Sequence, residues 1–207
     1  MIENLVFDMG GILVYDSYYE TFAENGFTLF EVAGFERILY AKEVSDIWEK
    51  RELGELTAAG LIRALSGVFP EYDDMFRFAI EKESECISEY GTTKYLKSLH
   101  DKGYGIYILS NYAKEPFMEI LGRENFDGNI DGYVVSCDEK VAKSDKRIFE
   151  MLYETYGLNP SACLFFDDRK QNIEAAEETG MQGIWIYAPE NLEWILSEIC
   201  SDRLVLE

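Results

Sequence analysis

Hydrophobic and polar positions follow two different patterns along the chain. Five short apolar runs, each bounded by glycine or polar residues, are typical of buried strands. They cover residues 2–7, 105–109, 132–136, 162–166 and 183–187. Helix-like patterns, several of them closed by a glycine, separate the last four runs. Strands that alternate with helices in this way predict an α/β fold with a Rossmann-like, doubly wound parallel sheet.

The stretch between the first run and this alternation has a different pattern. From about residue 18 to residue 90, apolar positions recur at helical spacing, with many phenylalanines, tyrosines and glutamates and no strong strand pattern. Breaks at Gly34, Gly54 and residues 67–70 divide this stretch into roughly four helices. We therefore expect a core built from residues 1–14 and 91–207 and a helical cap over residues 15–90.

Polar side chains follow three of the predicted strands at their carboxyl ends. These side chains are Asp8, Ser110, Asn111, Asp167 and Asp168. Parallel strands end at the same edge of a sheet, which is where open α/β sheets bind ligands. We therefore expect these side chains to lie close together. The ordinary alternative is that each residue only caps a turn or a helix.

Lys143, in the loop before a predicted helix, adds a cation to this set. Clustered carboxylates repel one another, and a hard divalent cation such as Mg²⁺ relieves that repulsion. Phosphoryl transfer needs mainly positioning and charge neutralisation, and a carboxylate in line with phosphorus, such as that of Asp8, can attack it. A solvated loop charge is the ordinary alternative for the lysine.

Four segments resemble, in order, the signature motifs of the haloacid dehalogenase superfamily. They are LVFDMGGILV, IYILSN, VAKSDKRIF and LFFDDRKQN. The resemblance covers the whole chain and is to the group with a helical cap inserted after the first strand. It implies a Mg²⁺-dependent phosphatase that acts on a small phosphorylated metabolite through an aspartyl-phosphate.

The resemblance also implies a metal site. Asp8 would be both nucleophile and metal ligand, and the backbone carbonyl of Gly10 would face the same ion. Asp168 would be the main acidic ligand, and Asp167 would contact the ion directly or through water.

The remaining motif residues would hold the phosphoryl group. Ser110 would donate a hydrogen bond to it, with Asn111 beside it, and Lys143 would bridge nucleophile and phosphate. Asn172 would organise the surrounding hydrogen bonds, with the orientation of Lys143 as one option.

The chain departs from the family pattern at Gly10. Phosphatases of this family usually carry there a second aspartate that acts as general acid and base, a contribution of typically about 10²–10⁴ in rate. The sequence is most similar to a subgroup with glycine at this position, the α-D-glucose-1-phosphate phosphatase-like proteins, which favours a sugar phosphate. Asp16 or a glutamate of the cap is a candidate substitute acid, and a helix N-cap is the alternative role for Asp16.

Gly10 also motivates other functions. A 2-haloacid dehalogenase uses the same aspartate without metal, but it does not need the Asp167–Asp168 pair. A weakly catalytic or non-catalytic protein that binds a phosphorylated ligand would tolerate the missing acid. A phosphoglucomutase is disfavoured, because transfer between two sugar oxygens needs a proton shuttle.

Charge and composition limit the classes of molecule that the protein is expected to bind. The net charge of −21 disfavours nucleic acids and anionic membranes, and no apolar run has transmembrane length. Four scattered cysteines predict reduced thiols, and the single histidine, His100, disfavours a Ser-His-Asp hydrolase. We expect a cytoplasmic enzyme whose partner is a small metabolite. The sequence does not predict the oligomeric state.

Overall fold

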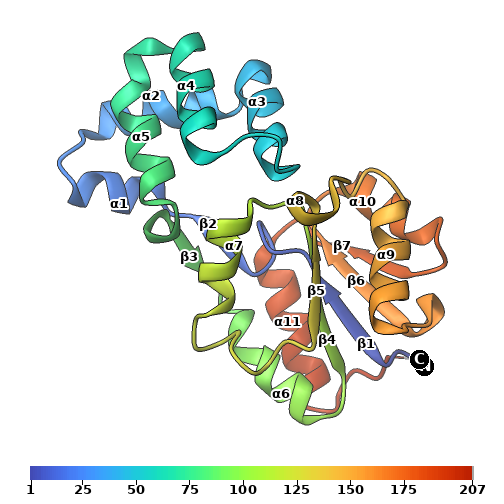
Figure 1. Ribbon diagram of the computed structural model, residues 1–207. Helices are drawn as coiled ribbons and strands as arrows, with labels where there is room; N and C mark the ends of the chain where they lie inside the picture. The colour runs from blue at the N-terminus through green and yellow to red at the C-terminus, as the bar shows by residue number, and fades with distance from the viewer. Residues whose placement is uncertain (207) are drawn as a thin grey trace.

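Five parallel strands form the sheet of the core in a computed structural model that describes residues 1–206 (Figure 1). Their spatial order is β5–β4–β1–β6–β7. The strands are β1 (Asn4–Phe7), β4 (Gly105–Ser110), β5 (Gly132–Val135), β6 (Cys163–Asp167) and β7 (Gln182–Trp185). In the central strand β1, Asn4 is paired with Gly105 on one side and with Cys163 on the other. Strands β1, β4 and β6 therefore lie side by side, and they carry three of the four motifs.

Helices cover both faces of this sheet. They are α6 (Leu96–Asp101), α7 (Lys114–Leu121), α8 (Ser136–Glu139), α9 (Arg147–Tyr156), α10 (Lys170–Glu177) and α11 (Pro189–Cys200), with 3₁₀ turns η3 (Thr93–Tyr95) and η4 (Pro160–Ala162). This architecture confirms the predicted α/β class with a parallel sheet. The four-residue helix α8 was not predicted, because it continues directly from β5 without a turn residue between them.

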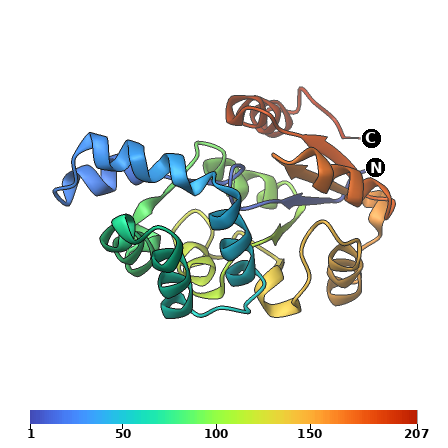
Figure 2. The ribbon, with the colours of Figure 1, turned by 90° about the horizontal axis from the view of Figure 1, so that it is seen from above.

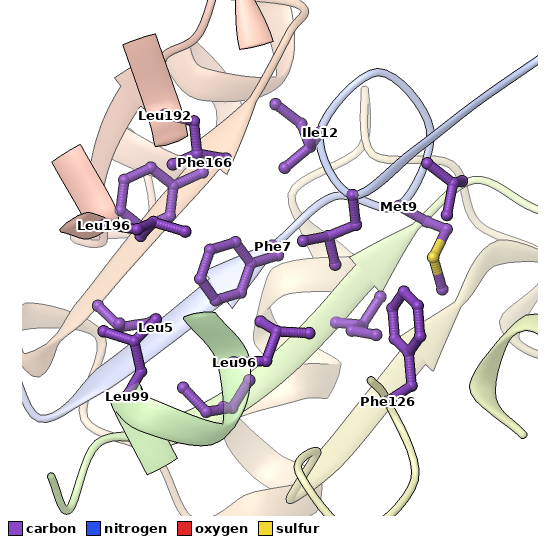
Figure 3. Close-up of a cluster of buried hydrophobic side chains, with 14 of the residues drawn as sticks. Leu5, Phe7, Met9, Ile12, Leu96, Leu99, Phe126, Phe166, Leu192 and Leu196 are labelled. Atoms are coloured by element: carbon purple, nitrogen blue, oxygen red, sulfur yellow. The ribbon is translucent and has the colours of Figure 1, made fainter. Parts of the chain in front are cut away.

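Side chains of β1 alternate between two hydrophobic layers, as the pleat of a strand requires. Leu5 and Phe7 belong to the layer formed with α6, α7 and α11, whereas Val6 belongs to the layer formed with α9 and α10. Figure 3 shows the first layer, in which Phe7 lies beside Phe166 of β6 at a ring-centroid distance of 5.1 Å. The buried residues Leu5, Val6 and Phe7 of β1 fix the position of the residue that follows them, Asp8.

The cap has its own aromatic core. Its helices are α1 (Tyr18–Glu24), α2 (Leu29–Leu39), α3 (Lys42–Glu52), α4 (Ala58–Val68) and α5 (Asp73–Glu81), with 3₁₀ turns η1 (Pro70–Tyr72) and η2 (Glu83–Cys86). Phe35 is fully buried and lies 5.3 Å, between ring centroids, from both Phe22 and Phe76. No helix of residues 1–206 combines the length and the apolar character that crossing a membrane requires.

The predicted number of cap helices, roughly four, was too small, because residues 18–81 form five α-helices. Gly34 was expected to break a helix, but it lies within α2. A β-carbon on Gly34 would lie 2.7 Å from the Tyr72 hydroxyl oxygen, so the glycine allows close packing there. The chain instead turns at Gly26, whose φ of +90° suits a residue without a side chain.

A two-stranded antiparallel ribbon joins the cap to the core. Strand β2 (Val14–Asp16) pairs with β3 (Ile87–Glu89), and Asp16 lies opposite Ile87. The strand β3 was not predicted, because three residues are too few to show a periodic pattern. Figure 1 shows the cap helices on the side of the core toward which the sheet strands point. Figure 2 shows the C-terminal segment of the core (orange to red) on the side away from the cap.

Candidate active site

Asp8 lies at the carboxyl end of β1 and is 6% exposed. One carboxylate oxygen, Oδ1, accepts a hydrogen bond from the backbone N–H of Met9 at 2.6 Å. The same oxygen accepts a second hydrogen bond, at 2.8 Å, from the hydroxyl of Ser110 at the end of the neighbouring strand β4. The parallel pairing of β1 with β4 thus brings two residues that are 102 positions apart into contact.

Lys143 lies between two carboxylates. Its ammonium nitrogen is 2.6 Å from Asp8 Oδ2 and 2.7 Å from Asp167 Oδ2, and its side chain is 2% exposed. Burial acts to lower the pKa of Lys143, but the two carboxylates outweigh burial and raise it, so the lysine stays charged. The backbone N–H of Lys143 donates to Asn111 Oδ1 at 2.9 Å, which fixes the loop that carries the ammonium group.

Asp167 is fully buried at the end of β6, and both of its oxygens are occupied. Oδ1 accepts from the backbone N–H of Arg169 at 2.7 Å, and the Asn172 amide donates to both oxygens at 3.0 Å. Asn172 therefore acts on Lys143 through the Asp167 carboxylate, to which both side chains donate. Together these groups form a continuous hydrogen-bonded network from β1 to α10.

Three carboxylates converge at this edge of the sheet. Asp8, Asp167 and Asp168 each offer an oxygen, and these oxygens all lie within 4.8 Å of one another. Unlike the other two, the Asp168 side chain is exposed. Gly11, with φ +74°, makes room for it, since a β-carbon there would lie 2.8 Å from Asp168 Oδ2. No role of Gly11 was predicted from the sequence, where its only signal is its position in a glycine pair.

The charges in this cluster do not balance. Burial raises the pKa of the Asp8 carboxyl to about 7, Lys143 opposes that shift, and Asp167 adds to it. Burial and then Asp167 also raise the pKa of Asp168. One lysine thus faces three carboxylates, and an all-oxygen donor set with excess negative charge fits a hard divalent cation.

Gly10 offers no side chain to this cluster. A β-carbon on Gly10 would have its nearest neighbour, the Tyr112 ring, 4.0 Å away, so the space is open and no nearby packing requires a glycine. Any general acid must therefore come from another part of the chain.

Asp16 lies in the ribbon rather than in the carboxylate cluster. It is the last residue of β2, and the N-cap position of α1 belongs to Ser17. The Asp16 side chain is exposed, but nearby protein atoms displace part of the water around its carboxyl group. This desolvation, together with the charge of Glu36, raises the pKa of Asp16 to about 6. Within residues 1–206, no hydrogen bond or ion pair connects Asp16 to Asp8.

A cap residue does reach the site. Glu52, the last residue of α3, is partly buried, and burial raises the pKa of its carboxyl to about 7. Arg169 and Lys143 oppose this shift and Asp8 adds to it, so the Glu52 carboxyl lies within electrostatic reach of all three. From the sequence a cap glutamate was predicted only in general, because nothing local distinguishes Glu52 among the 40 acidic residues.

Residues 2–180 match the family model of the haloacid dehalogenase-like hydrolases. The chain belongs to this family. The predicted superfamily is thus confirmed, and this HAD-like protein is a hydrolase by family.

Its curated relatives differ in how much of their length they share with the chain. The phosphorylated carbohydrates phosphatase of Thermotoga maritima is 22% identical over 196 residues, which cover 89% of the chain and 84% of that protein. Acyl-CoA dehydrogenase family member 10 of Mus musculus is 30% identical over 102 residues, which cover 47% of the chain but 9% of the mouse protein.

Solved structures of similar fold include a HAD family enzyme bound to magnesium and phosphate and a protein described as a dehalogenase. A HAD family enzyme from Bacteroides thetaiotaomicron, in complex with magnesium and inorganic phosphate, has a TM-score of 0.66 and 21% identity, over 89% of the chain and 94% of that protein. A protein described as a dehalogenase has a TM-score of 0.74 and 19% identity, over 100% of the chain and 98% of that protein. At these identities the likeness establishes the fold.

Proposed function

We propose that this HAD-like hydrolase is a Mg²⁺-dependent phosphatase that hydrolyses a small phosphorylated metabolite through an aspartyl-phosphate on Asp8. One observation carries the proposal. The buried Asp8 carboxylate is held by Ser110 and Lys143 and lies within 4.8 Å, oxygen to oxygen, of the Asp167–Asp168 pair. Such a cluster combines a positioned nucleophile with an anionic site for a hard cation.

Asp8, Asp168 and the Gly10 carbonyl would hold the ion. Both oxygens of Asp167 already accept hydrogen bonds, which favours contact through water for this residue. When bound, Mg²⁺ would neutralise charge on the phosphoryl oxygens.

The residues of the chain would divide the reaction between them. The Asp8 carboxylate attacks phosphorus, the bond from phosphorus to the leaving-group oxygen breaks, and water then hydrolyses the aspartyl-phosphate. Lys143 and Ser110 already donate to Asp8, so their donor groups are placed to bind the transferring phosphoryl oxygens as well. Preorganised donors of this kind act without reorganising during the reaction.

We further propose a sugar phosphate as the substrate class. The resemblance to the α-D-glucose-1-phosphate phosphatase-like subgroup supports it, and so does the relative that is named a phosphorylated carbohydrates phosphatase. A sugar-1-phosphate has a better leaving group than a simple alkyl phosphate, so it depends less on a general acid at the position of Gly10.

A 2-haloacid dehalogenase is the second candidate, supported by the similar fold of a protein described as a dehalogenase. The packing of Gly11 against Asp168 favours the phosphatase, because it keeps a third carboxylate in the cluster. A metal-independent attack by Asp8 would gain nothing from that extra negative charge.

Assays of the same preparation against both substrate classes test the proposal. A panel of sugar phosphates is incubated with Mg²⁺, with EDTA, and with EDTA followed by excess Mg²⁺, and chloride release from 2-chloropropionate is measured in parallel. We expect phosphate release that EDTA removes and Mg²⁺ restores. Metal-independent chloride release without phosphate release would establish the dehalogenase instead. Tight binding of a sugar phosphate without turnover under any metal condition would indicate a binding protein.

A further inference from the structure

The end of helix α3 docks on the core beside the active site. The hydroxyl of Ser136, the first residue of α8, donates to the backbone carbonyl of Glu52 at 2.5 Å. The same hydroxyl accepts from the backbone N–H of Tyr112 at 3.1 Å. Ser136 is fully buried, and Tyr112 lies two residues after Ser110. The end of α3 is therefore joined, through Ser136, to the loop that follows β4 and carries the phosphate-binding candidate Asn111.

A second contact holds the same helix end. The ammonium group of Lys140 donates to the Gly54 carbonyl at 3.1 Å and to the Cys137 carbonyl at 2.7 Å. A β-carbon on Gly54, whose φ is +65°, would lie 2.8 Å from the Cys137 carbonyl oxygen and would also collide with the Lys140 ammonium group. A cation is favourable at the C-terminal end of a helix such as α3. Figure 1 shows this end of α3 directly above α8.

The docking places Glu52 of the cap beside the segment that follows Ser110, through the shared contact with Ser136. Asp8, Lys143 and Arg169 all lie within electrostatic reach of the Glu52 carboxyl. For the other candidate acid, Asp16, the neighbouring charge that raises the pKa is Glu36 of the cap and not a residue of the Asp8 cluster.

We propose that Glu52 is the general acid and base of the reaction and that the docked end of α3 delivers it in place of the side chain that Gly10 lacks. This inference rests on the proposed phosphatase function. In the first step Asp8 attacks phosphorus, the bond from phosphorus to the leaving oxygen breaks, and that oxygen takes the proton of the Glu52 carboxyl group.

In the second step the Glu52 carboxylate takes a proton from water, and the oxygen of that water attacks phosphorus. The bond from phosphorus to Asp8 then breaks. Phosphate is released, and Asp8 returns as a carboxylate and Glu52 as a carboxylic acid. One water molecule is consumed and no other reactant is needed.

The test compares two substrates in the variant Glu52→Gln. A sugar phosphate with a basic alkoxide leaving group needs the proton, whereas p-nitrophenyl phosphate, with a weakly basic leaving group, does not. We expect kcat/KM, which reports the steps up to formation of the aspartyl-phosphate, to fall about 10²–10⁴-fold for the sugar phosphate and less than about tenfold for p-nitrophenyl phosphate. Because the second step is the same for both substrates and also uses Glu52, kcat for p-nitrophenyl phosphate should fall as well. Glu49→Gln, an exposed position one turn earlier on α3, is the matched control and should change neither rate.

The docking itself is tested with Gly54→Ala, which leaves all core residues intact. If docking delivers Glu52, this variant should reproduce the selective loss with the sugar phosphate, because its β-carbon forces the end of α3 away from α8. Circular dichroism verifies that each variant is folded.

The outcomes separate this inference from the proposed function. A wild-type protein that hydrolyses neither substrate would refute the phosphatase itself. A wild-type phosphatase whose Glu52→Gln variant loses kcat/KM equally for both substrates, or loses it for neither, would refute the role of Glu52 alone. Equal loss of kcat/KM for both substrates in Gly54→Ala would show that docking serves another purpose than proton delivery.

Discussion

The buried charges of the core and those of the cap are satisfied to different degrees. In the core, Lys143 lies between Asp8 and Asp167, and every carboxylate oxygen of this trio has a partner within 3.0 Å. In the cap, Arg51 is 3% exposed and lies 2.6 Å from Glu83, nitrogen to oxygen. Yet the atoms in contact are not aligned for hydrogen bonding, and Nε of Arg51 also lacks a partner.

The pKa of Glu83 reflects this difference. Burial raises the pKa of the Glu83 carboxyl even though Arg51 opposes the shift. A buried network with all partners present is rigid, whereas an incompletely paired one is less stable and more easily rearranged. The comparison teaches that the buried charges of the core are held in one arrangement, whereas those of the cap keep unused hydrogen-bonding capacity.

Replacement of the nucleophile should have the largest effect. Asp8→Asn keeps the shape of the side chain and can still accept hydrogen bonds from Ser110 and Met9, but it cannot form the aspartyl-phosphate. We expect kcat to fall at least about 10³-fold in the phosphate-release assay. Asp46→Asn, at an exposed position of α3, is the control and should retain wild-type activity. A variant at position 8 that keeps a tenth of the activity would contradict the assigned role.

Removal of the Lys143 ammonium group should destabilise the core strongly. Lys143→Met leaves Asp8 and Asp167 as buried carboxylates without their shared partner, so the free energy of unfolding should fall by about 3–5 kcal/mol at pH 8. Urea unfolding measures this change. The control is Lys146→Met, whose ion pair with Glu178 is exposed and should contribute less than about 1 kcal/mol. Equal losses in both variants would show that the core network is no better organised than a surface pair.

Removal of the buried cation of the cap should destabilise the protein less, and a second substitution should restore the lost stability. Arg51→Met leaves the partly buried Glu83 unpaired, and we expect a loss of about 1–3 kcal/mol at pH 8. Because the original pair is poorly aligned, the double variant Arg51→Met/Glu83→Gln should return to within about 1 kcal/mol of the wild type in the same urea experiment. A double variant as unstable as the single one would mean that the pair is better satisfied than its geometry indicates.

The smallest expected effect is a pH dependence at the boundary between cap and core. Burial raises the folded-state pKa of Glu52 from 4.5 to about 7, with Arg169, Lys143, Asp8 and Glu49 as the facing charges. The folded state therefore holds this proton more tightly, so the contribution of Glu52 to stability is present below pH 4.5 and is lost as pH rises through about 7.

Glu52→Gln removes that loss. We expect the variant to exceed the wild type in free energy of unfolding by about 1–3 kcal/mol at pH 8, and by much less at pH 5. Urea titrations at the two pH values measure the difference, and Glu43→Gln, at an exposed position in the first turn of α3, should follow the wild-type curve. A Glu52→Gln variant that is less stable than the wild type at pH 8 would mean that the carboxylate is well paired in the folded protein.

The core residues of the candidate site could be located from the sequence. Asp8, Ser110 and Asp167 each end a strand or directly follow one, and the strands show as short apolar runs. Since parallel strands end at the same edge, recognising the strands is enough to predict that these side chains meet. The sequence marks helix boundaries less clearly: α7 begins at Lys114, two residues before Pro116, because a helix tolerates proline in its first turn.

The sequence by itself determined the fold class and the residues at the ends of the strands, because hydrophobic periodicity is a local property of the chain. Only the tertiary structure decided which cap residue approaches Asp8 and that Asn172 binds Asp167. The position of Glu52 depends on Ser136 and Gly54, which bring α3 and α8 close together across 84 positions of the chain. Contacts between distant segments arise from packing and leave no periodic pattern in the sequence.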